Sequence, residues 1–133
     1  MSSSVEGVLA RLSQGREDRL RHVEVRPARQ ATFEPWPSWV SEEVRRSFPG
    51  VTQPWKHQID AANIAHHGDH VVLSTGTASG KSLAYLLPIL NSIEVGSTAP
   101  NGRGATALYI APTKALAHDQ LRTLEERELP WLR

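Results

Sequence analysis

Hydrophobic residues recur at helical spacing in five separate parts of this 133-residue sequence. Positions three, four and seven apart lie on one face of a helix, so each of these runs predicts an amphipathic helix. The first run follows Ser3, whose spacing to Glu6 is that of a capping box. The apolar positions are Val5, Val8, Leu9 and Leu12; Val40, Val44 and Phe48 within 39–48; Trp55, Ile59, Ala62 and Ala65 after Pro54; Leu83, Leu86, Leu87 and Leu90 within 81–93; and Ala117, Leu121 and Leu124 before Pro130.

Two short apolar runs have the pattern of buried strands, at residues 71–73 and 105–111. Gly68 stands between the third helix and the first strand, where a left-handed residue would end the helix. Strands that alternate with helices of roughly ten or more residues predict an α/β fold with a parallel sheet. Two strands are too few for a complete open sheet, so the sequence predicts a partial one.

The residues before this alternating pattern have a different composition. Residues 15–37 are rich in arginine and contain Pro27, Pro35 and Pro37. These prolines favour an extended conformation, so we expect a strap that lies over another surface. We therefore expect two parts, an accessory helical and extended segment at 1–52 and the start of the α/β domain at 53–133.

Overall composition restricts the function only weakly. The 15 basic and 14 acidic residues give a net charge of +1, which provides no strong field for nucleic acid or anionic lipid. The sequence has no cysteine, so disulfides and thiolate metal sites are excluded. The N-terminus lacks the apolar run of a signal peptide or membrane span. These features predict a cytoplasmic protein without a membrane partner.

The strongest chemical signal follows the first predicted strand. Small residues allow backbone N–H groups to surround a phosphate, and the helix that follows presents its positive dipole end to the same anion. Lys81 would contact the β- and γ-phosphates, and Ser82 would bind the accompanying Mg²⁺. An ordinary turn between a strand and a capped helix is the alternative. The segment reads Thr75-Gly76-Thr77-Ala78-Ser79-Gly80-Lys81-Ser82, with Thr75 where the generic P-loop begins with glycine.

A second segment begins where the second predicted strand ends, and it reads Pro-Thr-Lys-Ala-Leu-Ala over residues 112–117, followed by Asp119 and Gln120. The carboxyl ends of parallel strands form the ligand crevice, so this loop should lie near the P-loop. Taken alone, Pro and Thr are also common at the start of a helix.

Together the two segments resemble a known family. TGTASGKSLAYLLPIL is similar to motif I, and APTKALAHDQLRTL to motif Ia, of superfamily 2 helicases of the DEAD/DEAH-box group. Their particular form resembles most the bacterial branch related to the mitomycin-repair helicase. The resemblance starts near residue 54 and implies that 53–133 is the first part of a RecA-like ATPase domain, truncated before its acidic motif.

The resemblance also implies residue roles. Gln58, in the run Pro-Trp-Lys-His-Gln, would select adenine, since an amide both donates and accepts hydrogen bonds. Thr113 and Lys114 would face the phosphates of a bound single strand, DNA more than RNA. The cofactors implied are ATP and Mg²⁺. The family also places an aromatic ring against the base, and the sequence leaves open whether Trp39, Phe48 or Trp55 would provide it.

The acidic motif that the family uses to hold Mg²⁺ and orient water is missing from these residues. Asp119 is the acid nearest to the motifs, and the family gives that position no such role. Phosphoryl transfer depends on positioned charges, including an arginine finger worth about three to five orders of magnitude in rate. We therefore identify no catalytic residue here, and we expect the chain alone to be inactive without downstream helicase sequence.

Two other functions remain open at this stage. A small P-loop kinase or other NTPase would explain the first motif, although it should also have a second acid and a lid. A non-catalytic nucleotide- or strand-binding module would keep the motifs for binding alone. His66, His67 and His70 fit a polar helix end better than a metal site, because Gly68 separates them and metal ligands must converge.

Overall fold

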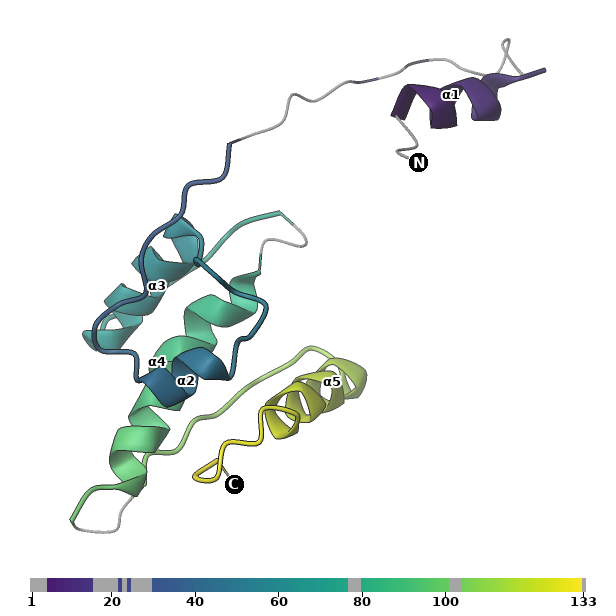
Figure 1. Ribbon diagram of the computed structural model, residues 1–133. Helices are drawn as coiled ribbons and strands as arrows, with labels where there is room; N and C mark the ends of the chain where they lie inside the picture. The colour runs from purple at the N-terminus through teal and green to yellow at the C-terminus, as the bar shows by residue number, and fades with distance from the viewer. Residues whose placement is uncertain are drawn as a thin grey trace. The chain divides into compact units, whose positions relative to one another are not determined.

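The computed structural model describes residues 5–15, 22, 24, 30–76, 80–100 and 104–132. Chain contacts divide the molecule into two compact units, residues 1–30 and 31–133 (Figure 1). In the described part of the chain, no helix is long and apolar enough to cross a membrane.

The first unit contains helix α1, Val5–Ser13, which confirms the predicted helix near the N-terminus. The Ser13 hydroxyl donates a 2.9 Å hydrogen bond to the carbonyl of Leu9. A serine hydroxyl that bonds back to the carbonyl four residues earlier is a common local contact within a helix. The predicted capping residue Ser3 lies outside the described residues, as do residues 16–21, 23 and 25–29 of the predicted strap.

The second unit begins with a short helix, α2, Glu42–Arg46. Ser41 is its N-cap, and the Ser41 side chain accepts a 3.1 Å hydrogen bond from the backbone N–H of Val44. The helix is shorter than the predicted 39–48. Ser41 has extended backbone angles, so the helix cannot begin before Glu42. Val44 is fully buried, as the apolar pattern predicted.

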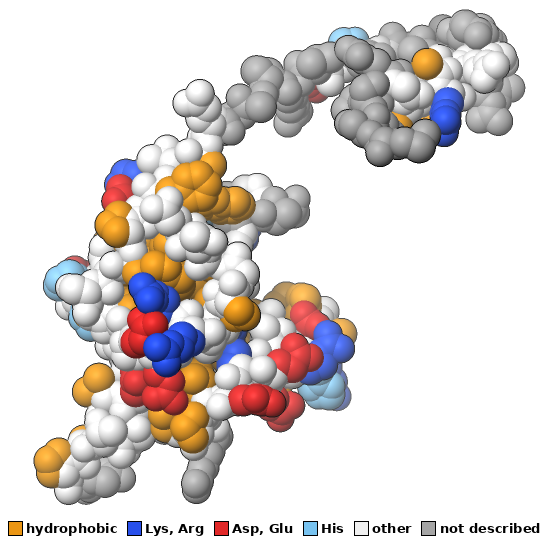
Figure 2. Space-filling model, in the orientation of Figure 1, with side chains coloured by type: hydrophobic (Ala, Val, Ile, Leu, Met, Phe, Trp, Pro, Cys, Tyr) orange, Lys and Arg blue, Asp and Glu red, His pale blue; other side chains and the backbone are white. Residues whose placement is uncertain are grey.

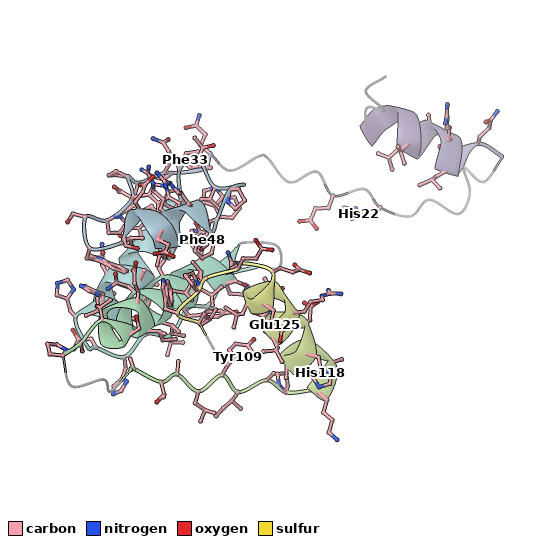
Figure 3. All side chains as sticks on the ribbon, turned by 60° about the horizontal axis from the view of Figure 1, so that its bottom comes forward. His22, Phe33, Phe48, Tyr109, His118 and Glu125 are labelled. Atoms are coloured by element: carbon pink, nitrogen blue, oxygen red, sulfur yellow. The ribbon has the colours of Figure 1, made fainter. Side chains whose placement is uncertain are left out.

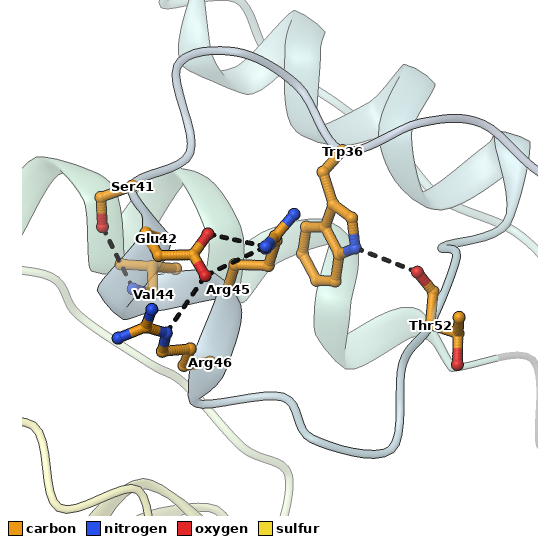
Figure 4. A network of polar contacts seen from close by, with 7 residues as sticks. All are labelled: Trp36, Ser41, Glu42, Val44, Arg45, Arg46 and Thr52. Carbon is orange, nitrogen blue, oxygen red and sulfur yellow. Dashed lines mark hydrogen bonds and ion pairs between the residues drawn. The ribbon is translucent and has the colours of Figure 1, made fainter.

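Charged side chains cover the solvent side of α2 (Figure 4). Glu42 forms ion pairs with Arg45 at 2.8 Å and with Arg46 at 3.1 Å. The hydrogen bond from Arg45, with the charges of both arginines, holds the pKa of the Glu42 carboxyl below its ordinary value. Beside this network the indole N–H of Trp36 points to the carbonyl of Thr52 at 3.4 Å.

Two longer helices, α3 (Lys56–His66) and α4 (Lys81–Ser97), pack against each other and confirm two predicted helices. Gly68 follows α3 with φ +92°, the left-handed conformation expected there. Leu87 and Leu90 of α4 are completely buried, and each burial contributes about 1.5–3 kcal/mol. The other members of this core are Val44, Phe48, Ile59, Ala62, Leu83, Leu86 and Leu129.

Helix α5, Lys114–Glu125, is the last of the predicted helices and is also confirmed. Charged side chains and a histidine gather on its outer face (Figure 2). Its partly buried Leu124 packs against the core. Of the residues predicted to face inward, Ala117 and Leu124 are partly buried, whereas Leu121 is 54% exposed, so the amphipathic pattern predicts the inward face of α5 only in part.

The chain after α5 returns to the segment that follows α2. The Arg127 guanidinium lies 3.9 Å above the centre of the Phe48 ring, and it donates to the carbonyl of Ser47. Burial lowers the pKa of Arg127. Leu129 enters the core.

The division between compact units falls after residue 30, whereas the expected domains were 1–52 and 53–133. Val44 and Phe48 explain the difference, because both are buried in the same core as α3 and α4. Residues 31–52 therefore belong structurally with the unit that carries α3 and α4.

The predicted parallel sheet is not present among the described residues. Residues 71–73 and 105–111 have no regular secondary structure, and Val72, Leu108 and Ile110 are 96%, 85% and 81% exposed. A strand requires hydrogen bonds to a neighbouring strand, and these segments have none in the described structure to pair with. The pairing observed is an isolated antiparallel bridge between Phe33 and Trp55.

Candidate nucleotide-binding site

The start of α3 positions the predicted adenine-reading residue. Gln58 lies in the first turn of α3 and is 6% exposed. Its side-chain Oε1 accepts a 2.8 Å hydrogen bond from the backbone N–H of Trp55, which satisfies a donor at the helix N-terminus. The glutamine is therefore held by its own helix.

The other end of the same amide reaches the predicted P-loop. Gln58 Nε2 donates a 2.8 Å hydrogen bond to the carbonyl of Gly80. The Trp55 N–H needs an acceptor, which in the Gln58 amide is the oxygen, and the Gly80 carbonyl needs a donor, which is the nitrogen. The two contacts therefore fix the orientation of the amide oxygen and nitrogen. One N–H hydrogen and one oxygen lone pair of Gln58 remain to bind a further group.

Gly80 forms the junction between the loop and α4. It is the N-cap of α4 and has φ +62°, in the left-handed region that glycine tolerates best. A Cβ at this position would lie 2.5 Å from Gln58 Nε2. Both the backbone angle and the close approach of Gln58 therefore favour glycine at this position.

Lys81 folds back over the loop. Its ammonium donates to the carbonyl of Thr75 at 3.1 Å, to the Thr75 hydroxyl at 3.2 Å and to the carbonyl of Gly76 at 2.8 Å. The threonine that stands in place of the usual glycine thus provides two of the oxygens that the lysine contacts. Thr77, Ala78 and Ser79 lie outside the described residues.

A cavity of about 510 Å³ adjoins Gln58 and Gly80. This volume lies within the range of about 300–1,000 Å³ that small-molecule sites occupy. Trp55 and Phe33 both line it. Backbone hydrogen bonds on either side of the Phe33–Trp55 bridge hold the two residues together, from Glu34 N–H to the Pro54 carbonyl at 3.0 Å and from Lys56 N–H to the Thr32 carbonyl at 2.8 Å.

The cavity distinguishes between the three aromatic residues that the sequence offered as candidates for the ring against the base. Trp55 borders it, whereas Phe48 is buried in the core. Trp39 stacks on His66 with ring centres 4.1 Å apart, and its indole N–H donates to Asn63 at 2.8 Å. Phe33, which is 49% exposed and labelled in Figure 3, was missed by the sequence analysis. Its place beside Trp55 depends on a pairing between distant segments that no local pattern reveals.

The predicted strand-contacting residues lie on another element. Thr113 is the N-cap of α5, and its Oγ1 accepts a 3.3 Å hydrogen bond from Leu116 N–H. Thr113 and Lys114 are both exposed at the start of that helix. The residues that line the cavity beside Gln58 include none from α5.

The histidines near the end of α3 have contacts of their own. His66 stacks on Trp39, and His67 Nδ1 lies 2.6 Å from the carbonyl of Asn63. No cluster of three or more possible metal ligands occurs among the described residues.

The residues present fit a magnesium nucleoside triphosphate. Ser82 is exposed in the first turn of α4, where the helix dipole favours an anion. Its hydroxyl shares a hydrogen bond with the Tyr85 phenol, and the hydroxyl oxygen keeps a lone pair that could bind a cation. The oxygens that hold Lys81 are loop oxygens at a solvent-accessible place, so a phosphate can replace them as partners of the ammonium.

Comparisons with known proteins identify a family match and similar helicases. The sequence profile described as DEAD/DEAH box helicase matches residues 55–130. The chain is 37% identical over 114 residues to the uncharacterized ATP-dependent helicase YprA of Bacillus subtilis, covering 84% of this chain and 14% of that protein. It is 43% identical over 74 residues to the ATP-dependent helicase hrq1 of Schizosaccharomyces pombe, covering 56% of this chain and 6% of that protein.

A solved structure is also similar. The helicase MrfA, crystallised with DNA and AMPPNP, matches with a TM-score of 0.66 and 38% identity over 74% of this chain and 13% of the MrfA chain. This likeness supports a RecA-like fold, although the described residues contain no strand. The predicted resemblance to superfamily 2 helicases is confirmed, and this chain belongs to the DEAD/DEAH box helicase family.

Proposed function

We propose that this chain is the ATP-binding segment of an ATP-dependent helicase that couples ATP hydrolysis to movement along a nucleic-acid strand. The observation that carries the proposal is that the side chains of Gln58 and Lys81 both bind backbone carbonyls of the same loop. Gln58 binds the Gly80 carbonyl, and Lys81 binds the carbonyls of Thr75 and Gly76. An adenine-selecting amide and a phosphate-binding cation thus approach the loop from its two ends.

Each residue has a part in this proposal. Lys81 holds the β- and γ-phosphates, and Ser82 binds the Mg²⁺ that neutralises them. The free N–H and lone pair of Gln58 match the acceptor and donor on the adenine edge. The loop residues Thr75, Gly76, Thr77, Ala78, Ser79 and Gly80 would surround the phosphates with backbone N–H groups.

Phe33 and Trp55 provide aromatic surface for the base. Both line the cavity that Gln58 borders, and stacking of a base on an aromatic ring is worth about 1–3 kcal/mol. We therefore assign the stacking role to this pair.

Thr113 and Lys114 are proposed to contact the strand. A hydroxyl donor and a cation at an exposed helix start are suitable for phosphate oxygens, which carry no sequence information. DNA is the proposed strand, supported by the DNA-bound state of the similar MrfA structure. A cytoplasmic location is part of the proposal, supported by the lack of cysteine.

Hydrolysis requires groups beyond those identified in these residues. The sequence contains no Asp-Glu-x-His or Asp-Glu-x-Asp string, and the chain spans 14% or less of the helicases named above. We propose that activity belongs to the natural-length protein, where residues 71–73 and 105–111 join a parallel sheet with further strands. Such a sheet would bury Val72, Leu108 and Ile110, whose exposure is otherwise costly.

Removal of the Lys81 ammonium tests the proposal. Lys81→Ala should weaken binding of a fluorescent ATP analogue to the natural-length protein by about 10- to 100-fold, because a charge-assisted hydrogen bond contributes about 1.5–3 kcal/mol. Lys56→Ala is the matched control, since Lys56 forms surface ion pairs with Asp60 and Glu34 instead. Equal affinity in both variants would refute the proposed nucleotide site.

A further inference from the structure

A polar contact joins the helix that begins at the P-loop to the helix that begins at the proposed strand site. The Tyr85 hydroxyl of α4 donates a 2.7 Å hydrogen bond to Gln120 Oε1 of α5. The two residues are far apart in sequence, and the bond is partly buried. It therefore links two elements that the proposed function assigns to different ligands.

On α4, Tyr85 lies close to the end of the helix that is proposed to bind the nucleotide. Ser82 and Tyr85 are three positions apart, so their side chains lie on the same face of the helix. Burial raises the pKa of the Tyr85 phenol, and hydrogen bonding with the Ser82 side chain acts in the opposite direction. The phenol is thus placed between the residue proposed to bind Mg²⁺ and Gln120.

On α5, Gln120 lies on the same face as Thr113, the residue proposed to contact the nucleic-acid strand. Thr113 caps the helix, and Gln120 follows it by about two turns, which returns to the same side of a helix. A shift or rotation of α5 that follows strand binding at Thr113 would change the position of Gln120, because a helix moves as a rigid element.

The surroundings favour a defined contact. The Tyr109 ring lies 5.7 Å from the Tyr85 ring, on the segment that connects α4 to α5 (Figure 3). Tyr85 and Gln120 both border an apolar cavity of about 790 Å³ between the two helices. A hydrogen bond in such surroundings is specific in direction, and losing one partner leaves the other group poorly solvated.

We infer that the hydrogen bond between Tyr85 and Gln120 positions α5 relative to α4 and so couples nucleotide binding at Ser82 to strand binding at Thr113. The inference rests on the proposed function. Tyr85 and Gln120 are positioning residues in this scheme and touch neither ligand. By thermodynamic linkage, each ligand then changes the affinity for the other by the same factor.

The test measures that factor in the natural-length protein. Affinity for fluorescein-labelled oligo(dT) is measured by anisotropy with and without AMPPNP and Mg²⁺, and the ratio of the two dissociation constants is the coupling factor. Tyr85→Phe and Gln120→Leu should each change this ratio toward one by about 3- to 10-fold, the usual range for residues that transmit coupling. The double variant should match the single variants, because both remove the same bond.

Two further variants separate coupling from packing. Gln120→Glu keeps an oxygen acceptor for the Tyr85 hydroxyl and should retain the wild-type ratio. Thr123→Val removes another α5 hydroxyl, one that donates to the carbonyl of Asp119 within the same helix, and should also leave the ratio unchanged.

The inference is overturned if Tyr85→Phe keeps the wild-type ratio, if Gln120→Glu behaves like Gln120→Leu, or if the wild-type protein binds both ligands independently. In the first two cases nucleotide and strand still bind and affect each other, so the proposed function stands. Independent binding by the wild-type protein would also count against the coupling of ATP hydrolysis to movement. A wild-type protein that binds neither AMPPNP nor oligo(dT) would instead remove the proposed function, and this inference with it.

Discussion

Gln58 and Gly80 form a direct contact between the start of α3 and the start of α4. The side-chain Nε2 of Gln58 donates to the Gly80 carbonyl at 2.8 Å, and a Cβ on residue 80 would lie 2.5 Å from that nitrogen. A single hydrogen bond therefore ties the proposed adenine-selecting residue to the loop that is proposed to hold the phosphates.

Gly80→Ala should consequently damage both stability and nucleotide binding. The left-handed φ of +62° costs a residue with a Cβ about 1–2 kcal/mol, and the overlap with Gln58 adds to this cost. We expect a free energy of unfolding in urea that is lower by about 2–3 kcal/mol, and an ATP affinity that falls with it.

Gly68→Ala provides the matched control for this prediction. Gly68 also has a positive φ, +92°, but a Cβ there meets nothing within 4 Å. It should show the conformational cost alone and leave ATP affinity unchanged. Equal effects of the two substitutions on ATP binding would contradict the role given to the Gln58 contact.

The ring of Phe33 should contribute to the affinity for the adenine base and not to the affinity for the phosphates. Phe33→Ala is expected to weaken ATP binding by about 5- to 150-fold, because base stacking on a ring contributes about 1–3 kcal/mol. Binding of inorganic tripolyphosphate should stay unchanged, since Lys81 and the loop remain intact. Isothermal titration with both ligands distinguishes these outcomes, and a parallel loss for tripolyphosphate would show that Phe33 acts on the fold.

The helices could be predicted from sequence, and candidate site residues could be proposed, because the signals for both are local. The stripe of Leu83, Leu86, Leu87 and Leu90 defines α4, and all four are buried. Gly80 and Lys81 were found because a P-loop needs small residues and a cation at fixed spacing. Gln58 was proposed from the resemblance to the helicase family, which has its adenine-reading glutamine at a similar separation from that loop.

The features that sequence analysis missed depend on contacts between distant segments. Phe33 reaches the cavity through its bridge to Trp55, and Phe48 joins the core, covered by Arg127. No periodicity within one segment encodes either pairing. The predicted sheet is absent from the described residues for the same reason. An apolar run such as 105–111 indicates a tendency to form a strand but does not show which strand would pair with it.

Tyr85 should make stability depend on pH in the alkaline range. Burial raises its pKa above the ordinary 10.0, so the folded protein binds the phenol proton more tightly than the unfolded chain. The contribution of Tyr85 to the free energy of unfolding is therefore complete below pH 10 and is lost as pH rises through the folded-state pKa.

Urea unfolding between neutral pH and the alkaline range tests this dependence. Tyr85→Phe should lose less stability on alkalinisation than the wild type, because its ring cannot ionise. Tyr109→Phe should keep most of the wild-type dependence, since burial of Tyr85 is the largest cause of the shift. Identical pH profiles for Tyr85→Phe and the wild type would contradict the assignment.

Hydrogen exchange tests whether residues 71–73 and 105–111 form strands in the natural-length protein. In the described structure these segments have no ladder hydrogen bonds, and Val72 is 96% exposed. If further strands complete a parallel sheet, their amides should exchange slowly, since protected amides open only through local or global unfolding. The buried helix α4 provides an internal reference for full protection, and the exposed start of α5 at Lys114 provides one for weak protection. Fast exchange at 71–73 and 105–111 alongside a protected α4 would mean that the sheet does not form, because an unpaired extended segment cannot shield its backbone from water.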